Sequence, residues 1–195
     1  MDNISSKTVL RSMILEKRNM LGTEERNEKS RKIAEKLYEL ETFKNADDFL
    51  LYVDYRSEVI TRPLIDRLLN EGKKVYCPKV IGMDISFYRI DRQSDLASGY
   101  QGILEPAENV LKRYTSLVQN DNSIVIVPGS VFDIYGNRMG YGKGFYDRFL
   151  SKYQKLCRIA VCFDLQISDN VIPHNENDIK MNYIISERRT LRING

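Results

Sequence analysis

Short apolar runs alternate along this chain with longer segments that have the periodicity of amphipathic helices. The clearest run covers residues 124–127 and another covers 49–53, and further strands are expected at 74–80, 157–161 and 181–185. Runs that are apolar at every position are typical of strands covered on both faces. Strands that alternate with helices are joined by right-handed crossovers, which produce a largely parallel sheet. The alternation therefore predicts an α/β protein with a three-layer α/β/α arrangement around a Rossmann-like sheet.

Two helices are expected before the first strand. Ser5 or Ser6 is expected to cap the first, which breaks near Gly22, and Thr23 is expected to cap the second. The side chains expected to face the core from these helices are Val9, Leu10, Met13, Ile14, Met20, Ile33, Leu37 and Leu40.

Further helices are expected between the later strands. One begins at residues 61–63 and ends at Gly72, and another covers residues 144–153. A short helix is expected at 110–117, and residues 83–90 are expected to form an edge strand.

Length and composition favour one globular domain covering residues 1–195. The chain has 42% hydrophobic and 29% charged residues, and no linker or repeat divides it. Its 30 Lys and Arg residues nearly balance 27 Asp and Glu residues, so the net charge of +3 does not indicate nucleic-acid binding. No apolar run approaches the roughly 20 residues that cross a bilayer. We expect a monomer whose partners are small molecules, with neither nucleic acid nor membrane among them.

The few cysteine and histidine residues restrict the possible chemistry. Cys77, Cys157 and Cys162 are odd in number and lack C-x-x-C spacing, so reduced core thiols in a cytoplasmic protein are expected. His174 is the single histidine, which excludes His-rich zinc sites and pairs of catalytic histidines.

A glycine-rich segment follows the clearest strand. Four glycines lie within residues 136–144, interleaved with Arg138 and Lys143, and a helix is expected directly behind them. Glycines allow a ligand to approach the backbone N–H groups, and a helix N-terminus and basic side chains favour phosphate. Asp147, in the first helical turn, is an oxygen ligand suited to Mg²⁺. In open parallel sheets ligands bind beyond the carboxyl ends of the strands, so the loops after Val53 and Val127 are expected to share one edge.

The segment differs from the common nucleotide-binding motifs. Asn137 and Gly144 stand where a Walker loop needs Gly and Ser or Thr, and Phe145 stands where the dinucleotide fingerprint needs its third Gly. The glycine count alone therefore leaves open a loop with tight turns and solvated basic side chains.

The order of residues 133–147, Asp-x-x-Gly-x-Arg-Met-Gly-x-Gly-x-Gly-Phe-Tyr-Asp, resembles the signature of the 5-formyltetrahydrofolate cyclo-ligase (5,10-methenyltetrahydrofolate synthetase) family. Met139 stands where the family usually has Leu or Ile. Gln101 stands where the family has an aromatic residue, which here is Tyr100, one position earlier. Weaker matches lie at Lys7-x-x-Leu10-Arg11, Ser57-Glu58-Val59, Gly102-Ile103-Leu104-Glu105-Pro106, and Pro173 followed by Asp178.

The resemblance implies a ligase that uses ATP and Mg²⁺ to convert 5-formyltetrahydrofolate into 5,10-methenyltetrahydrofolate, releasing ADP and phosphate. It implies metal ligation by Asp147 and Asp178, and folate contacts from Val53, Glu58 and Tyr146. Arg138 and Lys143 would be the catalytic cations. The residues implied to bind ATP are Lys7, Arg11, Arg138, Met139, Gly140, Tyr141, Gly142, Lys143, Gly144, Phe145 and Tyr146. Because ATP activates the substrate, this reaction needs no strong side-chain base, which fits a chain with one histidine.

Several assignments have alternatives at this stage. Lys7 and Arg11 share a helix face that is also compatible with solvation, and Glu58 is equally compatible with an exposed loop. Asp178 is equally compatible with a plain Asx-turn, and Glu176 competes for the metal role. For function, the alternatives are a small-molecule kinase of similar fold and a non-catalytic nucleotide- or folate-binding module.

Overall fold

The structure is a computed structural model that describes residues 3–110 and 122–193. The short helix expected at 110–117 therefore lies outside the described residues, apart from Val110. None of the helices in these two ranges is long and apolar enough to cross a membrane.

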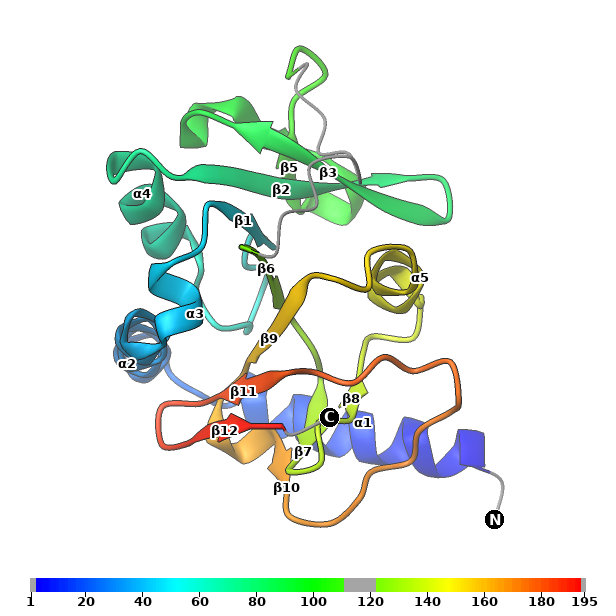
Figure 1. Ribbon diagram of the computed structural model, residues 1–195. Coiled ribbons are helices and arrows are strands. Elements are labelled where there is room, and N and C mark those ends of the chain that lie inside the picture. The colour runs from blue at the N-terminus through cyan, green and yellow to red at the C-terminus, as the bar shows by residue number, and fades with distance from the viewer. Residues whose placement is uncertain (1–2, 111–121, 194–195) are drawn as a thin grey trace.

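A seven-stranded, largely parallel sheet forms the centre of the described structure (Figure 1). Its inner pairs, β1–β2, β1–β6, β6–β9 and β9–β11, are parallel, and its two edge pairs, β2–β3 and β11–β12, are antiparallel. The predicted α/β class is confirmed. Along the sheet the strands follow the order β12 (Thr190–Arg192), β11 (Tyr183–Ile185), β9 (Cys157–Val161), β6 (Ser123–Val127), β1 (Asp48–Leu51), β2 (Lys74–Ile81) and β3 (Asp84–Ile90).

Helices cover both faces of this sheet (Figure 1). On one face, Phe49 and Leu51 of β1 share a buried cluster with residues from α2 (Thr23–Glu39), α3 (Glu41–Lys44) and α4 (Arg62–Asn70). On the other face, Leu50 shares a cluster with Phe149 and Leu150 of α5 (Phe145–Lys152). Successive strand residues face opposite sides, so a run that is apolar at every position supplies both clusters.

A smaller sheet follows β6 and was not predicted. It has the order β10-β7-β8, formed by β7 (Val131–Asp133), β8 (Arg138–Met139) and β10 (Ile167–Ser168). The fully buried Asp133 fixes the turn between β7 and β8, because its carboxylate accepts bonds from the backbone N–H groups of Tyr135, Asn137 and Ile172, each at 2.9 Å. A hairpin of β4 (Leu96–Ser98) and β5 (Leu104–Pro106) is likewise additional to the prediction.

The expected apolar stripe of the first helix is confirmed at two positions and wrong at three. In α1 (Asn3–Asn19) Ile14 is buried and Leu10 packs against the same cluster, but Val9 is 65% and Met13 45% exposed, and Met20, just past the helix, is 84% exposed. The inward face also carries Lys7, Arg11 and Arg18, because it borders a cavity as well as the small sheet.

The N-terminal caps of the first two helices also differ from those expected. Ser5 and Ser6 lie inside α1, and Gly22 rather than Thr23 occupies the N-cap position of α2. Among the cysteines, Cys77 and Cys162 are buried and Cys157 is half-buried, and all three are free thiols.

Candidate active site

A cavity of about 560 Å³ lies beyond the carboxyl ends of β1 and β6. It is lined by α1, by the loop after β1, by the β2–β3 hairpin and by the glycine-rich segment. The loops after Val53 and Val127 share this edge of the sheet, as the parallel pairing of β1 and β6 requires. Every residue predicted as part of the site lines the cavity: Lys7, Arg11, Val53, Glu58, Arg138, Met139, Gly140, Tyr141, Gly142, Lys143, Gly144, Phe145, Tyr146, Asp147 and Asp178.

The glycine-rich segment turns sharply before α5. Gly142 and Gly144 have φ values of 94° and 66°, a region that favours glycine. Gly144 is the N-cap of α5 and leaves the first helical turn without a side-chain cap. Between the two glycines, Lys143 is exposed, and no ion-pair or hydrogen-bond partner for its ammonium group is found in the part of the chain that the structure describes. The turn thus presents backbone N–H groups and one free cation to the cavity.

Arg138 lies beneath this turn and is almost completely buried. Only 3% of its side chain is exposed, and its Nη2 donates to Asp147 Oδ1 at 2.8 Å. Nη1 donates to the carbonyl of Pro128 at 3.3 Å, and the buried Nε has no partner among residues 3–110 and 122–193. The guanidinium also lies 5.8 Å from the centre of the Tyr146 ring. Arg138 is therefore a fixed cation that retains unused donor capacity.

The basic face of α1 contacts two other segments that line the cavity. Lys7 Nζ pairs with Asp178 Oδ2 at 3.2 Å, and Arg11 Nε donates to the carbonyl of Gly140 at 3.0 Å. These side chains face the cavity rather than bulk solvent, in contrast to the solvated-face alternative.

The Asp178 carboxylate has two partners in the described structure. Its Oδ2 accepts from Lys7 Nζ at 3.2 Å and from the backbone N–H of Asn175 at 2.8 Å. Asn175 lies three residues earlier in the chain, so this bond is not the Asx-turn considered from the sequence, in which the side chain bonds a backbone N–H two residues further on. Glu176 and His174 are not among the residues that line the cavity, and His174 Nδ1 lies 3.0 Å from the carbonyl of Ile172. Asp178 rather than Glu176 is therefore the carboxylate that faces the cavity.

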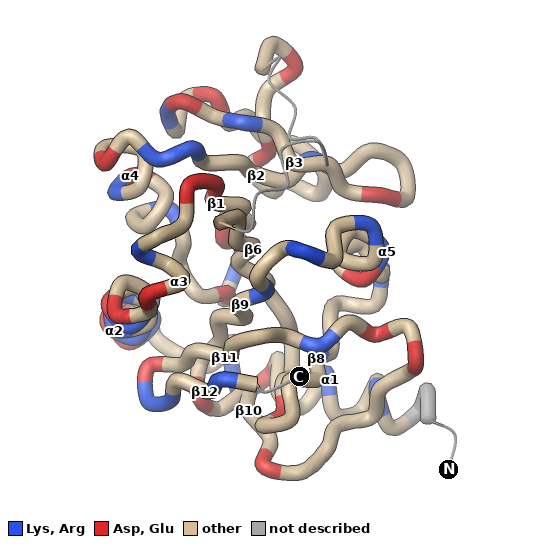
Figure 2. Tube along the Cα trace, viewed as in Figure 1, with Lys and Arg blue, Asp and Glu red and all other residues tan. Residues whose placement is uncertain are grey.

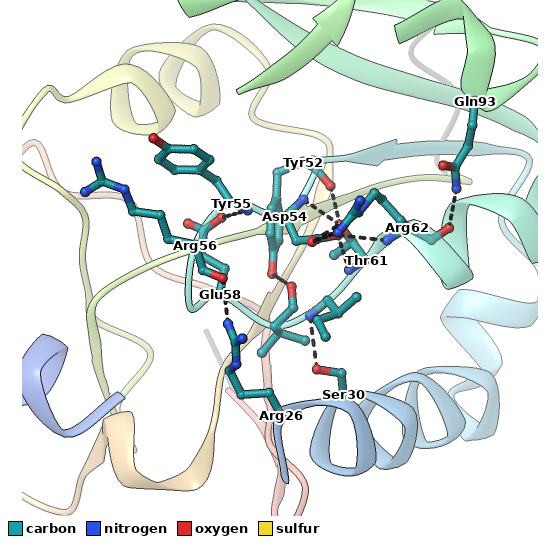
Figure 3. A network of polar contacts seen from close by, with 12 residues as sticks. Arg26, Ser30, Tyr52, Asp54, Tyr55, Arg56, Glu58, Thr61, Arg62 and Gln93 are labelled. Carbon is teal, nitrogen blue, oxygen red and sulfur yellow. Dashed lines mark hydrogen bonds and ion pairs between the residues drawn. The ribbon is translucent and has the colours of Figure 1, made fainter. Parts of the chain in front are cut away.

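A polar network holds the loop between β1 and α4 (Figure 3). The Asp54 carboxylate accepts bonds from the backbone N–H groups of Thr61 and Arg62, both at 3.0 Å, and pairs with the Arg62 guanidinium at 3.1 Å. The Thr61 hydroxyl donates to the carbonyl of Tyr52 at 2.7 Å, and the Tyr52 hydroxyl donates to that of Val59 at 2.9 Å. The loop that carries Glu58 is thereby fixed at both ends.

Glu58 is a half-buried carboxylate that lines the cavity. Its Oε2 accepts the backbone N–H of Tyr55 at 3.0 Å. Burial raises the pKa of Glu58, and the Tyr141 hydroxyl and the charge of Arg18 partly offset this effect. Glu58 is therefore an anchored acceptor whose charge depends on its neighbours.

Two carboxylates that line the cavity, Asp147 and Asp178, are suitable ligands for a hard cation. Among the described residues there is no group of three or more His, Cys, Asp and Glu side chains that could hold a metal alone. Mg²⁺ is commonly held by one or two carboxylates together with substrate phosphates and water. The donor set therefore fits a magnesium ion that arrives with a nucleotide.

Several lining residues were not given a site role from the sequence. The most notable is Arg18, which is 5% exposed and lies close to the stripe of α1 that carries Lys7 and Arg11. The spacing of seven residues from Arg11 to Arg18 was the available signal. Tyr100, the aromatic residue that the sequence offers one position before the family's aromatic position, does line the cavity next to Gln101, and its ring lies edge-on to Phe145 at 6.3 Å. The other unpredicted lining residues include Tyr55, Arg56, Pro78, Val80 and Ile85.

Comparison with known proteins gives consistent similarities. The model of the 5-formyltetrahydrofolate cyclo-ligase family matches residues 3–187. A probable 5-formyltetrahydrofolate cyclo-ligase of Schizosaccharomyces pombe is 32% identical over 174 residues, which cover 82% of this chain and 84% of that protein. The Escherichia coli 5-formyltetrahydrofolate cyclo-ligase is 29% identical, covering 89% and 96%. The NMR structure of Aquifex aeolicus 5,10-methenyltetrahydrofolate synthetase superposes with a TM-score of 0.84 at 34% identity, covering 97% of this chain and 93% of that one.

Fold and similarities define a ligase of folate one-carbon metabolism. The chain belongs to the 5-formyltetrahydrofolate cyclo-ligase family, whose reaction is the ATP-dependent conversion of 5-formyltetrahydrofolate into 5,10-methenyltetrahydrofolate. The family and the ligase class predicted from the sequence are confirmed. Family membership decides against the small-molecule kinase and the non-catalytic binding module.

Proposed function

We propose that the cavity binds ATP and 5-formyltetrahydrofolate together, and that it closes the folate ring by phosphorylating the formyl oxygen. The observation that carries the proposal is the composition of its walls. The cations Lys7, Arg11, Arg138 and Lys143 line it together with the glycine turn, and so does the carboxylate of Glu58, which the backbone of Tyr55 anchors. Such a cavity suits a polyphosphate and a polar heterocycle at the same time.

The chemistry explains why ATP is needed. A formamide is a poor electrophile, because its nitrogen donates electron density into the carbonyl group. Transfer of the γ-phosphoryl group to the formyl oxygen breaks the bond to ADP, withdraws electron density from carbon and creates a good leaving group. N10 of the folate then attacks that carbon, and phosphate departs as the ring closes. Catalysis of the first step consists mainly of positioning the reactants and stabilising phosphate charge.

The cations have separate roles in this proposal. Arg138 is a rigid donor beneath the phosphates, while the exposed Lys143 closes on them from the turn. Lys7 and Arg11 extend the positive charge from α1, and the backbone of residues 139–146 surrounds the triphosphate.

Val53 and Glu58 contact the folate in this proposal. Val53 is 2% exposed and supplies an apolar wall, while Glu58 accepts hydrogen bonds from the N–H groups of the folate heterocycle. Tyr146 belongs to both subsites in this proposal. Its ring packs edge-on against Phe87 at 6.4 Å, and its buried hydroxyl has no partner among the described residues. That hydroxyl is available to a bound ligand.

Asp147 and Asp178 are the proposed magnesium ligands. When bound, the ion neutralises phosphate charge and orients the triphosphate. Asp147 Oδ1 accepts from Arg138, which leaves Oδ2 for a second cation, and the Arg138 contact orients the carboxylate.

Exchanging Asp147 for Asn should raise the Mg²⁺ concentration needed for half-maximal activity about 10–100-fold. Asn retains an oxygen that can accept from Arg138, so the ion-paired arginine keeps a partner while the second anionic oxygen is lost. The measurement is a magnesium titration of initial rates at saturating ATP and folate. Asp169→Asn is the matched control, since Asp169 also pairs with an arginine, Arg189, at 2.9 Å and does not line the cavity. An unchanged titration for Asp147→Asn would remove this residue from the metal site.

The proposal also covers the state of the protein in the cell. We infer a single domain over residues 1–195 that acts as a monomer in the cytoplasm on small-molecule substrates. The free thiols and the +3 net charge support this inference, which rests on sequence and composition.

A further inference from the structure

Arg18 is a buried cation in the cavity wall that the protein does not pair with a carboxylate. It belongs to α1, is 5% exposed and lines the cavity. Within residues 3–110 and 122–193, no Asp or Glu side chain forms an ion pair with its guanidinium. Burial of an unpaired charge is unfavourable, so buried charges in proteins are normally paired or bound to a ligand. An unpaired arginine that lines a cavity therefore points to an anion that arrives with the ligand.

Neutral oxygens hold this guanidinium in place. Its Nε donates to Ser57 Oγ at 3.1 Å, and its Nη1 donates to the Tyr141 hydroxyl at 2.7 Å and to the carbonyl of Gly129 at 3.4 Å. The guanidinium also lies 5.6 Å from the centre of the Tyr141 ring. Nη2 has no hydrogen-bond partner in the described part of the chain. Because a guanidinium can only donate, the Nη2 hydrogens are left for a ligand oxygen.

The two other cations on this side of α1 contact the phosphate side of the proposed site. Lys7 pairs with Asp178, a proposed magnesium ligand, and Arg11 donates to the carbonyl of Gly140 at the start of the glycine turn. Arg18 lies seven residues beyond Arg11, which corresponds to about 10 Å along a helix axis. It is therefore at the end of this row of cations that is remote from the metal carboxylate.

At this end of the row, Arg18 contacts both of the segments that hold the reactants in the proposed function. Through Tyr141 it contacts the glycine turn, and through Ser57 it contacts the loop after β1. Ser57 directly precedes Glu58, the proposed folate acceptor. In the proposed reaction, the γ-phosphoryl group is the anion that passes from one reactant to the other. The unpaired guanidinium lies between the two segments that hold those reactants.

We propose that Arg18 is a further catalytic residue, whose Nη2 donates to oxygens of the phosphoryl group as it moves from ATP to the formyl oxygen. This inference rests on the proposed function. In this step the bond between the γ-phosphorus and the bridging oxygen breaks, the bonding electrons leave with ADP, and a bond forms between that phosphorus and the formyl oxygen. Arg18 neither gains nor loses a proton. It stabilises the charge on the transferred oxygens.

Exchanging Arg18 for Met removes the charge and keeps a long unbranched side chain. We expect kcat to fall about 10²–10³-fold, the effect of losing one donor to a developing charge. The KM values for ATP and for 5-formyltetrahydrofolate should both stay within about threefold, because an interaction made only in the transition state changes kcat and not binding. Steady-state kinetics, with each substrate varied while the other is saturating, gives the three constants. A residue that only shaped the wall would change KM instead.

Arg158→Met is the matched control. Arg158 is half-buried, has no ion pair among the described residues and donates to the carbonyl of Gln154 at 3.3 Å, but it does not line the cavity. Its replacement should leave kcat and both KM values within about twofold of those of the intact chain.

Arg18→Lys keeps the test decisive if Arg18→Met does not fold, which urea unfolding of each sample shows. A lysine retains the positive charge, but its single ammonium group cannot keep the wall contacts of the guanidinium and also reach the phosphoryl group. We therefore expect folded protein whose kcat is at least about tenfold lower, again with both KM values within about threefold.

The possible outcomes separate this inference from the proposed function. A loss confined to kcat in a folded Arg18 variant supports the inference. If a folded variant keeps its kcat, or shows its loss in the KM of a substrate, the inference is overturned and the proposed function stands. If the intact chain forms no methenyl product with ATP, the proposed function fails, and the role of Arg18 fails with it.

Discussion

Replacing Lys143 by Ala is expected to lower kcat by about 10²–10³-fold and to leave the free energy of unfolding unchanged. The reason is its position. Its side chain is exposed at the glycine turn, and it has no hydrogen-bond or ion-pair partner in the described part of the chain. Because its ammonium group makes no such contact there, we expect it to act on bound phosphate and not to stabilise the fold. Steady-state kinetics with both substrates saturating, together with urea unfolding of the same samples, measures the two quantities.

Lys155→Ala is the matched control for this experiment. Lys155 is also an exposed lysine without a partner among the described residues, and it does not line the cavity. Its removal should leave both kcat and stability unchanged. Near-normal turnover in Lys143→Ala would show that this lysine does not act on the phosphates.

Arg138→Ala is expected to reduce kcat at least as much as Lys143→Ala does. In this variant the free energy of unfolding should fall as well. Arg138 is buried and paired with Asp147 at 2.8 Å, so its removal leaves a partly buried carboxylate without its cation. Breaking such a pair costs about 3 kcal/mol or more when both groups are well buried, and somewhat less here because 27% of the Asp147 side chain is exposed. Urea unfolding should therefore separate Arg138→Ala from Lys143→Ala, although both lose turnover.

Arg138→Lys shows whether charge or geometry is required. A lysine keeps the charge and can pair with Asp147, but it cannot reproduce the several fixed donors of a guanidinium. We expect most of the stability to return and most of the activity to remain lost. Normal turnover in either variant would contradict the role given to Arg138, and unchanged stability in Arg138→Ala would contradict its buried ion pair.

The central sheet was predictable because its signal is local. Residues 124–127 are apolar at every position, and burial on both faces of a parallel sheet selects that pattern. β7, β8 and β10 were missed because strands of two or three residues carry no periodicity. They are held instead by distant groups such as the Asp133 carboxylate, which bonds the backbone of Ile172.

Hydrophobicity predicted only part of the inner face of α1, namely Leu10 and Ile14, for a related reason. A helix face that borders a ligand cavity is selected for its contacts with the cavity, so Lys7 and Arg11 point inward while Val9 and Met13 are exposed. Figure 2 shows the wide distribution of Lys and Arg along the trace, which is why charge alone does not mark a site. Only the order of residues in 133–147 identified the family, and only the fold brought Arg18 into contact with Tyr141.

The most direct test of the account follows the near-ultraviolet absorbance of the methenyl product. The intact chain is mixed with 5-formyltetrahydrofolate and Mg²⁺, ATP is added last, and inorganic phosphate is measured in the same samples. The account predicts a rise in absorbance that begins with ATP, with one phosphate released for each methenyl group formed. Folded protein that gives no ATP-dependent rise, or that accumulates a stable phosphorylated folate without free phosphate, would contradict it.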